Sequence, residues 1–103
     1  MTTAFEVVAE PASREILDLL LDGARPVGEL VAETGLSQPN TSRHLRILRE
    51  AGLVESRPDG QRRLYELRPE GLAELERWLL PYRRLWRRGL DALERHLDEG
   101  ESR

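Results

Sequence analysis

The chain has 103 residues, of which 39% are hydrophobic and 34% are charged, which is enough apolar material for one modest domain. It contains no cysteine, which excludes disulfides, thiolate metal sites and a cysteine nucleophile. The net charge of −3 is unevenly spread: residues 37–68 hold seven arginines and four acidic residues, whereas the rest of the chain holds nine and fifteen. The middle third is therefore locally cationic, as a surface that meets a polyanion would be.

Two helices are predicted before residue 24. The first is short and lies within residues 1–9. The second begins at Pro11, since proline fits the first turn of a helix, and ends at Gly23. Apolar residues recur along it at helical spacing, which predicts a buried stripe made of Ile16, Leu17, Leu20 and Leu21.

A third and a fourth helix follow, joined by a tight connection at residues 34–36 that contains glycine. The third opens at Pro26, and its predicted buried residues are Val27, Leu30 and Val31. The fourth is capped by Ser37 and stops at Gly52, and its predicted buried seam is Thr41, Leu45 and Leu48. Two helices joined in this way are typical of a helix-turn-helix, which we predict over residues 26–51.

The next segment, residues 53–67, is predicted to be a β-hairpin. Strand-like stretches at 53–57 and 62–67 flank a turn that contains Asp59-Gly60, a pair that favours a two-residue loop with both central residues at positive φ. Arginines gather around this turn, and like charges that face each other across a β pair are destabilising unless phosphates lie between them. The alternative is local neutralisation by acidic neighbours. The arginines are Arg57, Arg62 and Arg63, and the acids are Glu55, Asp59 and Glu66.

A long helix is predicted over residues 70–98. Its apolar residues are spaced three or four apart in a heptad-like seam, which is too long for so small a core to cover, so we expect a second subunit to cover it. Pro81 should kink this helix, and Gly89 could break it in two. An aromatic column within the seam is predicted to be core or dimer interface; the alternative is a pocket for a small aromatic or apolar effector. The column is Trp78, Tyr82 and Trp86, and the full set of predicted interface residues is Phe5, Leu75, Trp78, Leu79, Tyr82, Trp86, Leu90 and Leu93.

The face of the fourth helix opposite its buried seam carries residues that can bind DNA. Gln38, Ser42, Arg43 and Arg46 share this face. Glutamine can pair with adenine through two hydrogen bonds, arginine with guanine, and serine with either base or with phosphate. An ordinary solvated helix face is the alternative, because polar outer faces are the rule.

Several segments of the chain resemble, in order, the ArsR-type winged helix-turn-helix regulators. The resemblance covers residues 5–97 and is carried by residues 8–17 (VAEPASREIL), 27–30 (VGEL), 36–39 (LSQP), 42–45 (SRHL), 48–54 (LREAGLV) and 60–65 (GQRRLY). It implies a mainly α fold with a small β-hairpin, organised as one winged helix-turn-helix domain. It also implies a homodimer that pairs through its terminal helices, binds an inverted-repeat operator and usually represses transcription.

The resemblance implies that Gln38, Ser42 and Arg43 face bases while the hairpin arginines hold the DNA backbone. Asn40 stands where many members carry a small apolar residue, and this makes it a further candidate contact. His44 could touch DNA or pack beside the third helix. The predicted DNA-binding residues are Ser37, Gln38, Asn40, Ser42, Arg43, His44, Arg46, Arg57, Arg62 and Arg63.

The candidate metal ligands are few. Many relatives sense metals through a cysteine pair, but residues 30–33 here read Leu-Val-Ala-Glu. The predicted final helix offers only His96, with Asp91, Glu94 and Glu99 nearby, and zinc sites are usually richer in histidine or cysteine. We therefore expect no metal or other cofactor; a metal-responsive repressor that uses these residues is the alternative.

Other functions are less well supported. With two isolated histidines and no glycine-rich phosphate loop, no nucleophile–base pair can be nominated, so an enzyme is not expected. A protein-binding winged-helix adaptor is disfavoured by the uneven distribution of arginine. No uncharged stretch approaches the ~18 residues of a membrane span, and the N-terminus does not read as a secretory signal. We expect a cytoplasmic protein whose partners are operator DNA, a second copy of itself and, as an option, a small-molecule effector.

Overall fold

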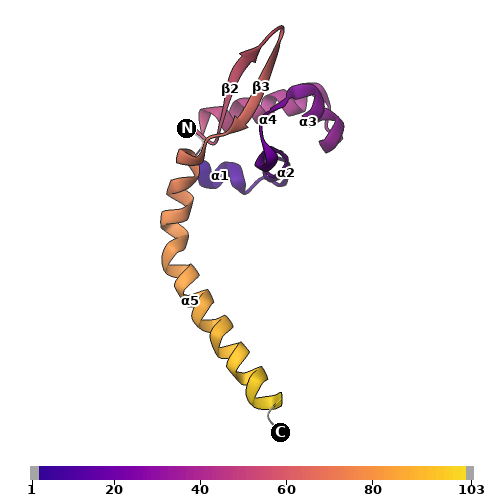
Figure 1. The fold of residues 1–103 in the computed structure, drawn as a ribbon. Coiled ribbons are helices and arrows are strands. Elements are labelled where there is room, and N and C mark those ends of the chain that lie inside the picture. Colours follow the sequence, from indigo (N-terminus) through magenta and orange to yellow (C-terminus); the bar gives the residue numbers. More distant parts are fainter. Residues whose placement is uncertain (1–2, 102–103) are drawn as a thin grey trace.

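The structure, a computed structural model, describes residues 3–101 and places a small helical body at one end of a long terminal helix (Figure 1). The long helix makes the molecule elongated, with principal extents of 65 × 28 × 21 Å. Its elements follow in the order α1 (Ala4–Val8), α2 (Pro11–Leu19), a 3₁₀ turn η1 (Leu20–Asp22), β1 (Arg25–Pro26), α3 (Val27–Thr34), α4 (Gln38–Glu50), β2 (Val54–Asp59), β3 (Arg62–Leu67) and α5 (Pro69–Glu101).

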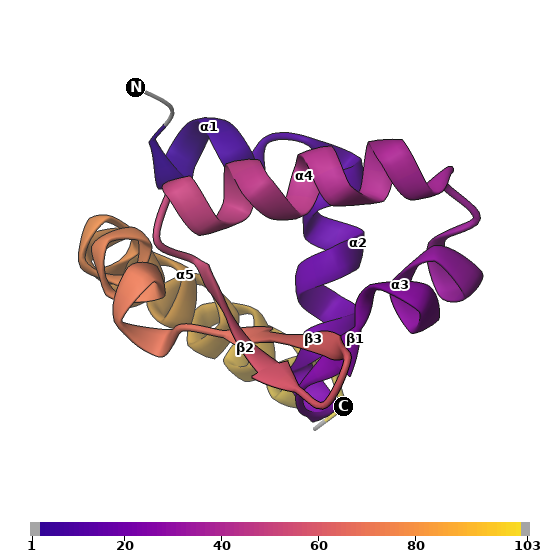
Figure 2. The ribbon, with the colours of Figure 1, turned by 90° about the horizontal axis from the view of Figure 1, so that it is seen from above.

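The core lies where α1, α2, α3 and α4 meet the start of the hairpin. It is made of small and medium aliphatic side chains, which suits a body of short helices packed at several angles (Figure 2). These side chains are Ala4, Val7, Ile16, Leu20, Leu30, Leu45, Leu48, Leu53 and Val54. The start of α5 joins this core through Leu72 and Leu75, which pack against it while remaining partly exposed.

Helix α2 differs from its prediction at its C-terminal end. The α-helix stops at Leu19 rather than Gly23, and the chain tightens into η1. A 3₁₀ turn has three residues per turn instead of 3.6, so residues beyond Leu19 leave the α-helical stripe. Leu21 is consequently 70% exposed, and its prediction as a buried residue was wrong. Ser13 is buried on the inner face instead.

Strand β1 was not predicted. Arg25 and Pro26 pair with Tyr65 and Leu64, so the hairpin gains a third antiparallel strand in the order β1-β3-β2. A two-residue strand has no readable periodicity, and its partner lies about 40 residues further along the chain. Pro26 therefore ends a strand and caps α3, which begins at Val27.

The hairpin turn also differs from its prediction. Asp59 pairs with Arg62, so the two-residue loop is Gly60-Gln61, and Gly60 is its only residue at positive φ (+64°). A glycine at the first central position is the preference of type II′ turns rather than of the Asp-Gly type expected. The register places Arg57 opposite Leu64 and Arg63 opposite Pro58. The expected arginines facing each other across the pair are therefore absent from this hairpin.

Helix α5 is continuous from Pro69 to Glu101 and passes through Gly89 without a break. Pro81 lies inside it, and Figure 1 shows the helix changing direction midway along its length. Its first turn packs tightly on the body, because a Cβ added at Gly71 would lie 1.9 Å from the carbonyl oxygen of Gly52. Within residues 3–101, every helix is too short or too polar to cross a membrane.

Candidate nucleic-acid interface

Helix α4 is built to present one face outward. Ser37 is its N-cap, and its hydroxyl accepts a hydrogen bond of 3.2 Å from the backbone N–H of Asn40. Thr41, Leu45 and Leu48 are buried as predicted. The hydroxyl of Thr41 donates to the carbonyl of Ser37 at 3.0 Å, so this polar side chain fits the core without an unmatched group. The opposite face, which we call the outer face of α4, is Gln38, Ser42, Arg43 and Arg46, all exposed.

The arginines of α4 have no acidic partners. Arg43, Arg46 and Arg49 form no ion pair with any residue in the described range 3–101. Part of the outer face is hollowed, and the side chains of Ser42, Arg43 and Arg46 line this hollow together with Pro39. An unpaired guanidinium keeps all its donors available for phosphate or for the edge of guanine.

The hairpin arginines are partly neutralised. Nε of Arg57 lies 3.4 Å from a carboxylate oxygen of Glu66, and Nε of Arg62 donates to Asp59 at 3.1 Å. Among residues 3–101, Arg63 has no carboxylate partner, and it donates to the hydroxyl of Ser56 at 3.2 Å. The local neutralisation considered as an alternative therefore applies to Arg57 and Arg62, while Arg63 remains the more available cation.

A second hollow connects α4 with the hairpin. It has a volume of about 570 Å³ and is lined by four arginines, together with Glu50, Glu55, Ser56 and Val54. We call the group Arg46, Arg49, Arg63 and Arg68 the arginine hollow. Arg49 and Arg68 were not among the predicted site residues. Their only signal in the sequence was membership of the cationic segment, because the hollow is formed by three elements that are separate in the chain.

The structure bears on one of the two alternatives for His44, packing beside the third helix, while its contact with DNA stays a prediction. Its Nδ1 lies 2.8 Å from the carbonyl oxygen of Asn40, and the ring lines a cavity beside α1 and α2 rather than packing on α3. Asn40 itself is exposed, and no hydrogen bond of its side-chain amide is found among residues 3–101. The amide of Asn40 is thus as free as the arginines of the outer face.

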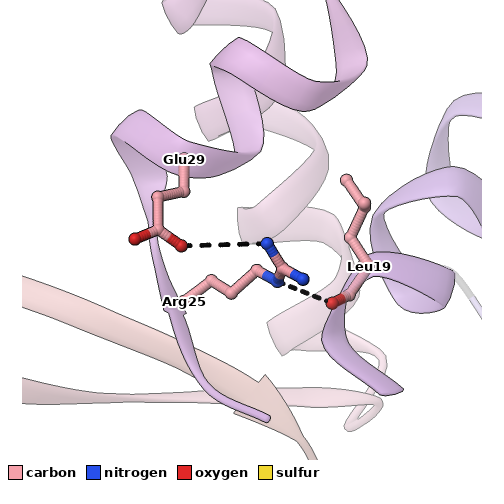
Figure 3. Close-up of polar contacts among 3 residues, drawn as sticks. All are labelled: Leu19, Arg25 and Glu29. Atoms are coloured by element: carbon pink, nitrogen blue, oxygen red, sulfur yellow. Dashed lines mark hydrogen bonds and ion pairs between the residues drawn. The ribbon is translucent and has the colours of Figure 1, made fainter. Parts of the chain in front are cut away.

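Arg25 holds the beginning of the helix-turn-helix in place (Figure 3). Its Nε donates to the carbonyl of Leu19 at 2.8 Å, and its Nη1 lies 3.8 Å from Glu29. The guanidinium bridges the end of α2 and the first turn of α3, two elements joined by β1. Arg25 is therefore engaged within the fold, unlike the arginines of α4.

Most of the predicted interface residues lie on an exposed side of α5. The exposed fractions range from 42% for Leu79 to 67% for Trp86. Phe5 of α1 stacks edge-on against Trp78, with ring centroids 5.8 Å apart, and Trp78 lies 5.1 Å from Tyr82. We call the set Trp78, Leu79, Tyr82, Trp86, Leu90 and Leu93 the apolar face of α5. Leu75 differs from the others because it already packs against the core.

We looked for side chains that could bind a metal ion together, as the metal-responsive alternative would require. Within the described part of the chain, no three histidine, aspartate or glutamate side chains lie close enough together to hold one ion. His96 is exposed on α5.

Comparisons with known proteins all point to bacterial transcriptional regulators. Residues 10–56 match the family described as bacterial regulatory protein, arsR family. The HTH-type transcriptional regulator Rv2034 of Mycobacterium tuberculosis is 39% identical over 95% of this chain and 90% of its own length. The transcriptional repressor SdpR of Bacillus subtilis is 32% identical over 80% of this chain and 91% of its own length.

A solved structure agrees with the fold. The homodimeric winged helix-turn-helix DNA-binding domain of a possible ArsR-family transcriptional regulator from Mycobacterium bovis superposes with a TM-score of 0.64. It is 32% identical, and the match covers 76% of this chain and 72% of the M. bovis domain. We interpret α3 and α4 as the helix-turn-helix, and we call the β2–β3 hairpin the wing. The fold is a winged helix-turn-helix, and the chain belongs to the arsR family of bacterial transcriptional regulators.

Proposed function

We propose that this protein is a cytoplasmic transcriptional repressor that binds an inverted-repeat operator as a homodimer. The observation that carries the proposal is the outer face of α4, whose arginines are exposed and have no carboxylate partner within residues 3–101. Leaving these exposed arginines unpaired costs the fold little, because exposed ion pairs contribute little to stability. Phosphates and base edges supply the missing partners.

Different side chains are proposed to contact the bases and the phosphates of the DNA. Gln38, Ser42 and Arg43 lie near the N-terminal end of α4, and the N-terminal residues of a recognition helix reach deepest into the major groove, which supports a role in reading bases. In this proposal, Arg46 and the wing arginines hold phosphates on either side. The hydroxyl of Ser37 accepts the capping hydrogen bond from Asn40, and its own O–H can still donate to a phosphate. Asn40 and the free Nε2 of His44 are further candidate contacts.

Pairing of two subunits is supported by the apolar face of α5. A run of exposed aromatic and leucine side chains this long is uncommon on a monomer, and it marks an interaction surface. The related M. bovis domain is described as homodimeric. Two copies of α4 in one dimer would enter successive major grooves, so the half-sites should lie about one helical turn, ~10 bp, apart. Repression is the role named for the SdpR relative.

The proposal is tested by measuring operator affinity with fluorescence anisotropy for Arg43→Ala and for Arg88→Ala. Arg43 is on the outer face of α4, whereas Arg88 is an exposed arginine of α5 that also has no ion pair among the described residues. Loss of one base contact should weaken specific binding about 10- to 100-fold for Arg43→Ala. Arg88→Ala should bind as the wild type does. An equal loss for both variants would contradict the proposal, since it would indicate a general charge effect.

A further inference from the structure

The arginine hollow lies next to the surface that is proposed to read DNA. Arg46 lines the arginine hollow and also the hollow on the outer face of α4, so the two are neighbours. The hairpin contributes Arg63, and the link between β3 and α5 contributes Arg68. Figure 1 shows α4 and the hairpin together at the end of the molecule opposite the C-terminal end of α5. The proposed function gives a role to Arg46 and Arg63 and leaves Arg49 and Arg68 without one.

Most of the positive charge in the arginine hollow is not used by the fold. Arg46, Arg49 and Arg63 form no ion pair within residues 3–101. Nε of Arg68 lies 3.9 Å from a carboxylate oxygen of Glu70, and both side chains are exposed. An exposed ion pair contributes little to stability, so Arg68 can exchange Glu70 for another anion at little cost.

Two carboxylates in the same lining do not cancel this charge. Glu50 and Glu55 form no ion pair with any residue in the described range. Four guanidinium groups and two carboxylates leave two positive charges in excess. The arginine hollow therefore favours an anion, and its four arginines offer more contacts than a single small anion needs.

The geometry of duplex DNA supplies such an anion at this place. A helix that lies in the major groove has a sugar-phosphate strand on each side of it. Each strand carries one negative charge per ~3.4 Å of helix axis. Arginine binds phosphate oxygens through two parallel hydrogen bonds. Because the arginine hollow lies between α4 and the hairpin, a strand that borders the groove entered by α4 can run along it.

We propose that the arginine hollow binds one sugar-phosphate strand of the operator, with Arg49 and Arg68 as further phosphate contacts. This inference rests on the proposed function, because it takes α4 as the helix in the major groove. Contacts to phosphate carry no sequence information and fix the position of the protein on the duplex. The backbone N–H of Arg68 donates to the carbonyl of Leu53 at 2.9 Å, which holds the start of α5 beside the end of α4. The bound strand thus contacts both helices.

The first test measures affinity by fluorescence anisotropy at several salt concentrations, for a duplex that carries the operator and for a scrambled duplex of equal length. Arg49→Ala and Arg68→Ala should each reduce the slope of log affinity against log salt concentration by about one. At about 0.1 M salt, each should bind both duplexes about five- to tenfold more weakly, so the ratio of the two affinities stays unchanged. Arg43→Ala should instead lower mainly the operator affinity, and Arg88→Ala should behave as the wild type does.

A purely structural role for Arg49 gives a different result. Arg49 lies in the last turn of α4, where a positive charge also interacts favourably with the helix dipole. Loss of that interaction alone would lower stability in urea and leave the salt slope of Arg49→Ala at the wild-type value, which would contradict the proposal. Arg49→Lys keeps the charge and should restore the slope.

The acids of the lining give a test of opposite sign. Glu55→Gln removes a negative charge beside the bound strand and should strengthen binding to both duplexes by about twofold or more. Glu15→Gln changes an exposed acid of α2 outside the lining and should bind as the wild type does. Equal effects of the two substitutions would contradict the proposal, since they would indicate a response to net charge alone.

Ethylation of single phosphates in the operator locates the contact. Ethylation of one phosphate beside the groove that α4 enters should weaken binding by the wild type and have no further effect on Arg49→Ala. A small polyanion is the other source of phosphate, and it is tested by titrating the protein with tripolyphosphate in a calorimeter. Saturable tripolyphosphate binding that Arg49→Ala abolishes, together with an unchanged salt slope on DNA, would overturn the proposal.

The outcomes separate this proposal from the proposed function. Wild-type slopes for both Arg49→Ala and Arg68→Ala, with the operator still preferred over the scrambled duplex, would refute the strand contact and leave the proposed function standing. Reduced slopes for both variants, with equal affinity of the wild type for the two duplexes, would refute sequence-specific repression and leave the strand contact standing.

Discussion

At the scale of single residues, two serines near the start of α4 differ in what their hydroxyls do. Ser37 is committed to the fold because its hydroxyl caps α4, whereas Ser42, one turn further on, is exposed and makes no hydrogen bond within residues 3–101. Both roles were predictable from the sequence, since capping preferences and helical spacing are local properties. The placement of His44 was not, because it depends on how α1 and α2 pack beside α4.

Ser37→Ala should lower the free energy of unfolding by about 1 kcal/mol, because the N–H of Asn40 loses its acceptor. Ser42→Ala should change stability by less than about 0.5 kcal/mol, and it should instead weaken operator binding. Urea denaturation of both variants measures the two changes in stability, and fluorescence anisotropy measures the change in operator binding. Equal destabilisation by the two substitutions would show that the cap has no special role.

At the scale of elements, the arginines of the wing must be considered with their neighbours. The cationic composition of residues 37–68 was evident in the sequence. The pairing of Arg57 with Glu66 and of Arg62 with Asp59 was not, because it depends on the strand register. The same applies to β1 and to the arginine hollow, which bring together residues distant in the chain. Local patterns thus predicted the helices and the hairpin, while contacts between elements had to be observed.

Arg63→Ala should reduce the slope of log affinity against log salt concentration by about one, because one phosphate contact is lost. Arg62→Ala should reduce it similarly if Arg62 exchanges Asp59 for a phosphate on binding. The measurement is a series of anisotropy titrations between low and high salt, with Arg88→Ala as the control. A wild-type slope in Arg63→Ala would remove the wing from the interface.

The junction between α5 and the body gives a second test at this scale. Gly71→Ala should destabilise the protein strongly, because the added Cβ would lie 1.9 Å from a backbone oxygen of Gly52 and the helix would have to shift. Gly89→Ala has open space around its Cβ and should stabilise α5 by up to about 1 kcal/mol. Thermal unfolding of both variants gives the answer. Similar melting temperatures for the two would mean that the close approach at Gly71 is not a constraint.

At the scale of the whole molecule, the outstanding feature is a helix of 33 residues that the body covers only at its start. The heptad-like spacing predicted this imbalance from the sequence, because a seam of that length exceeds what one small core can bury. The sequence could not say which part of the seam stays within the subunit. Leu72 and Leu75 do, whereas the apolar face of α5 remains exposed.

Leu90→Asp should convert the proposed dimer into a monomer, because it places a charge on the apolar face of α5. The body should stay folded, because the side chain is 50% exposed in the single chain and takes no part in the core. Arg88→Asp is the matched control, since helical spacing places it away from the apolar face. Sedimentation velocity measures the mass, and circular dichroism monitors the fold. A wild-type sedimentation coefficient for Leu90→Asp would place the subunit interface elsewhere.

The central claim, that two copies of α4 and the wing read duplex DNA together, is tested most directly by footprinting the protein on the DNA upstream of its own gene. The account predicts a protected inverted repeat whose half-sites lie about one helical turn, ~10 bp, apart. It also predicts that protection disappears with Arg43→Ala at a concentration where Arg88→Ala still protects. Protection of a single half-site by a monomer, or protection that persists in Arg43→Ala, would contradict it.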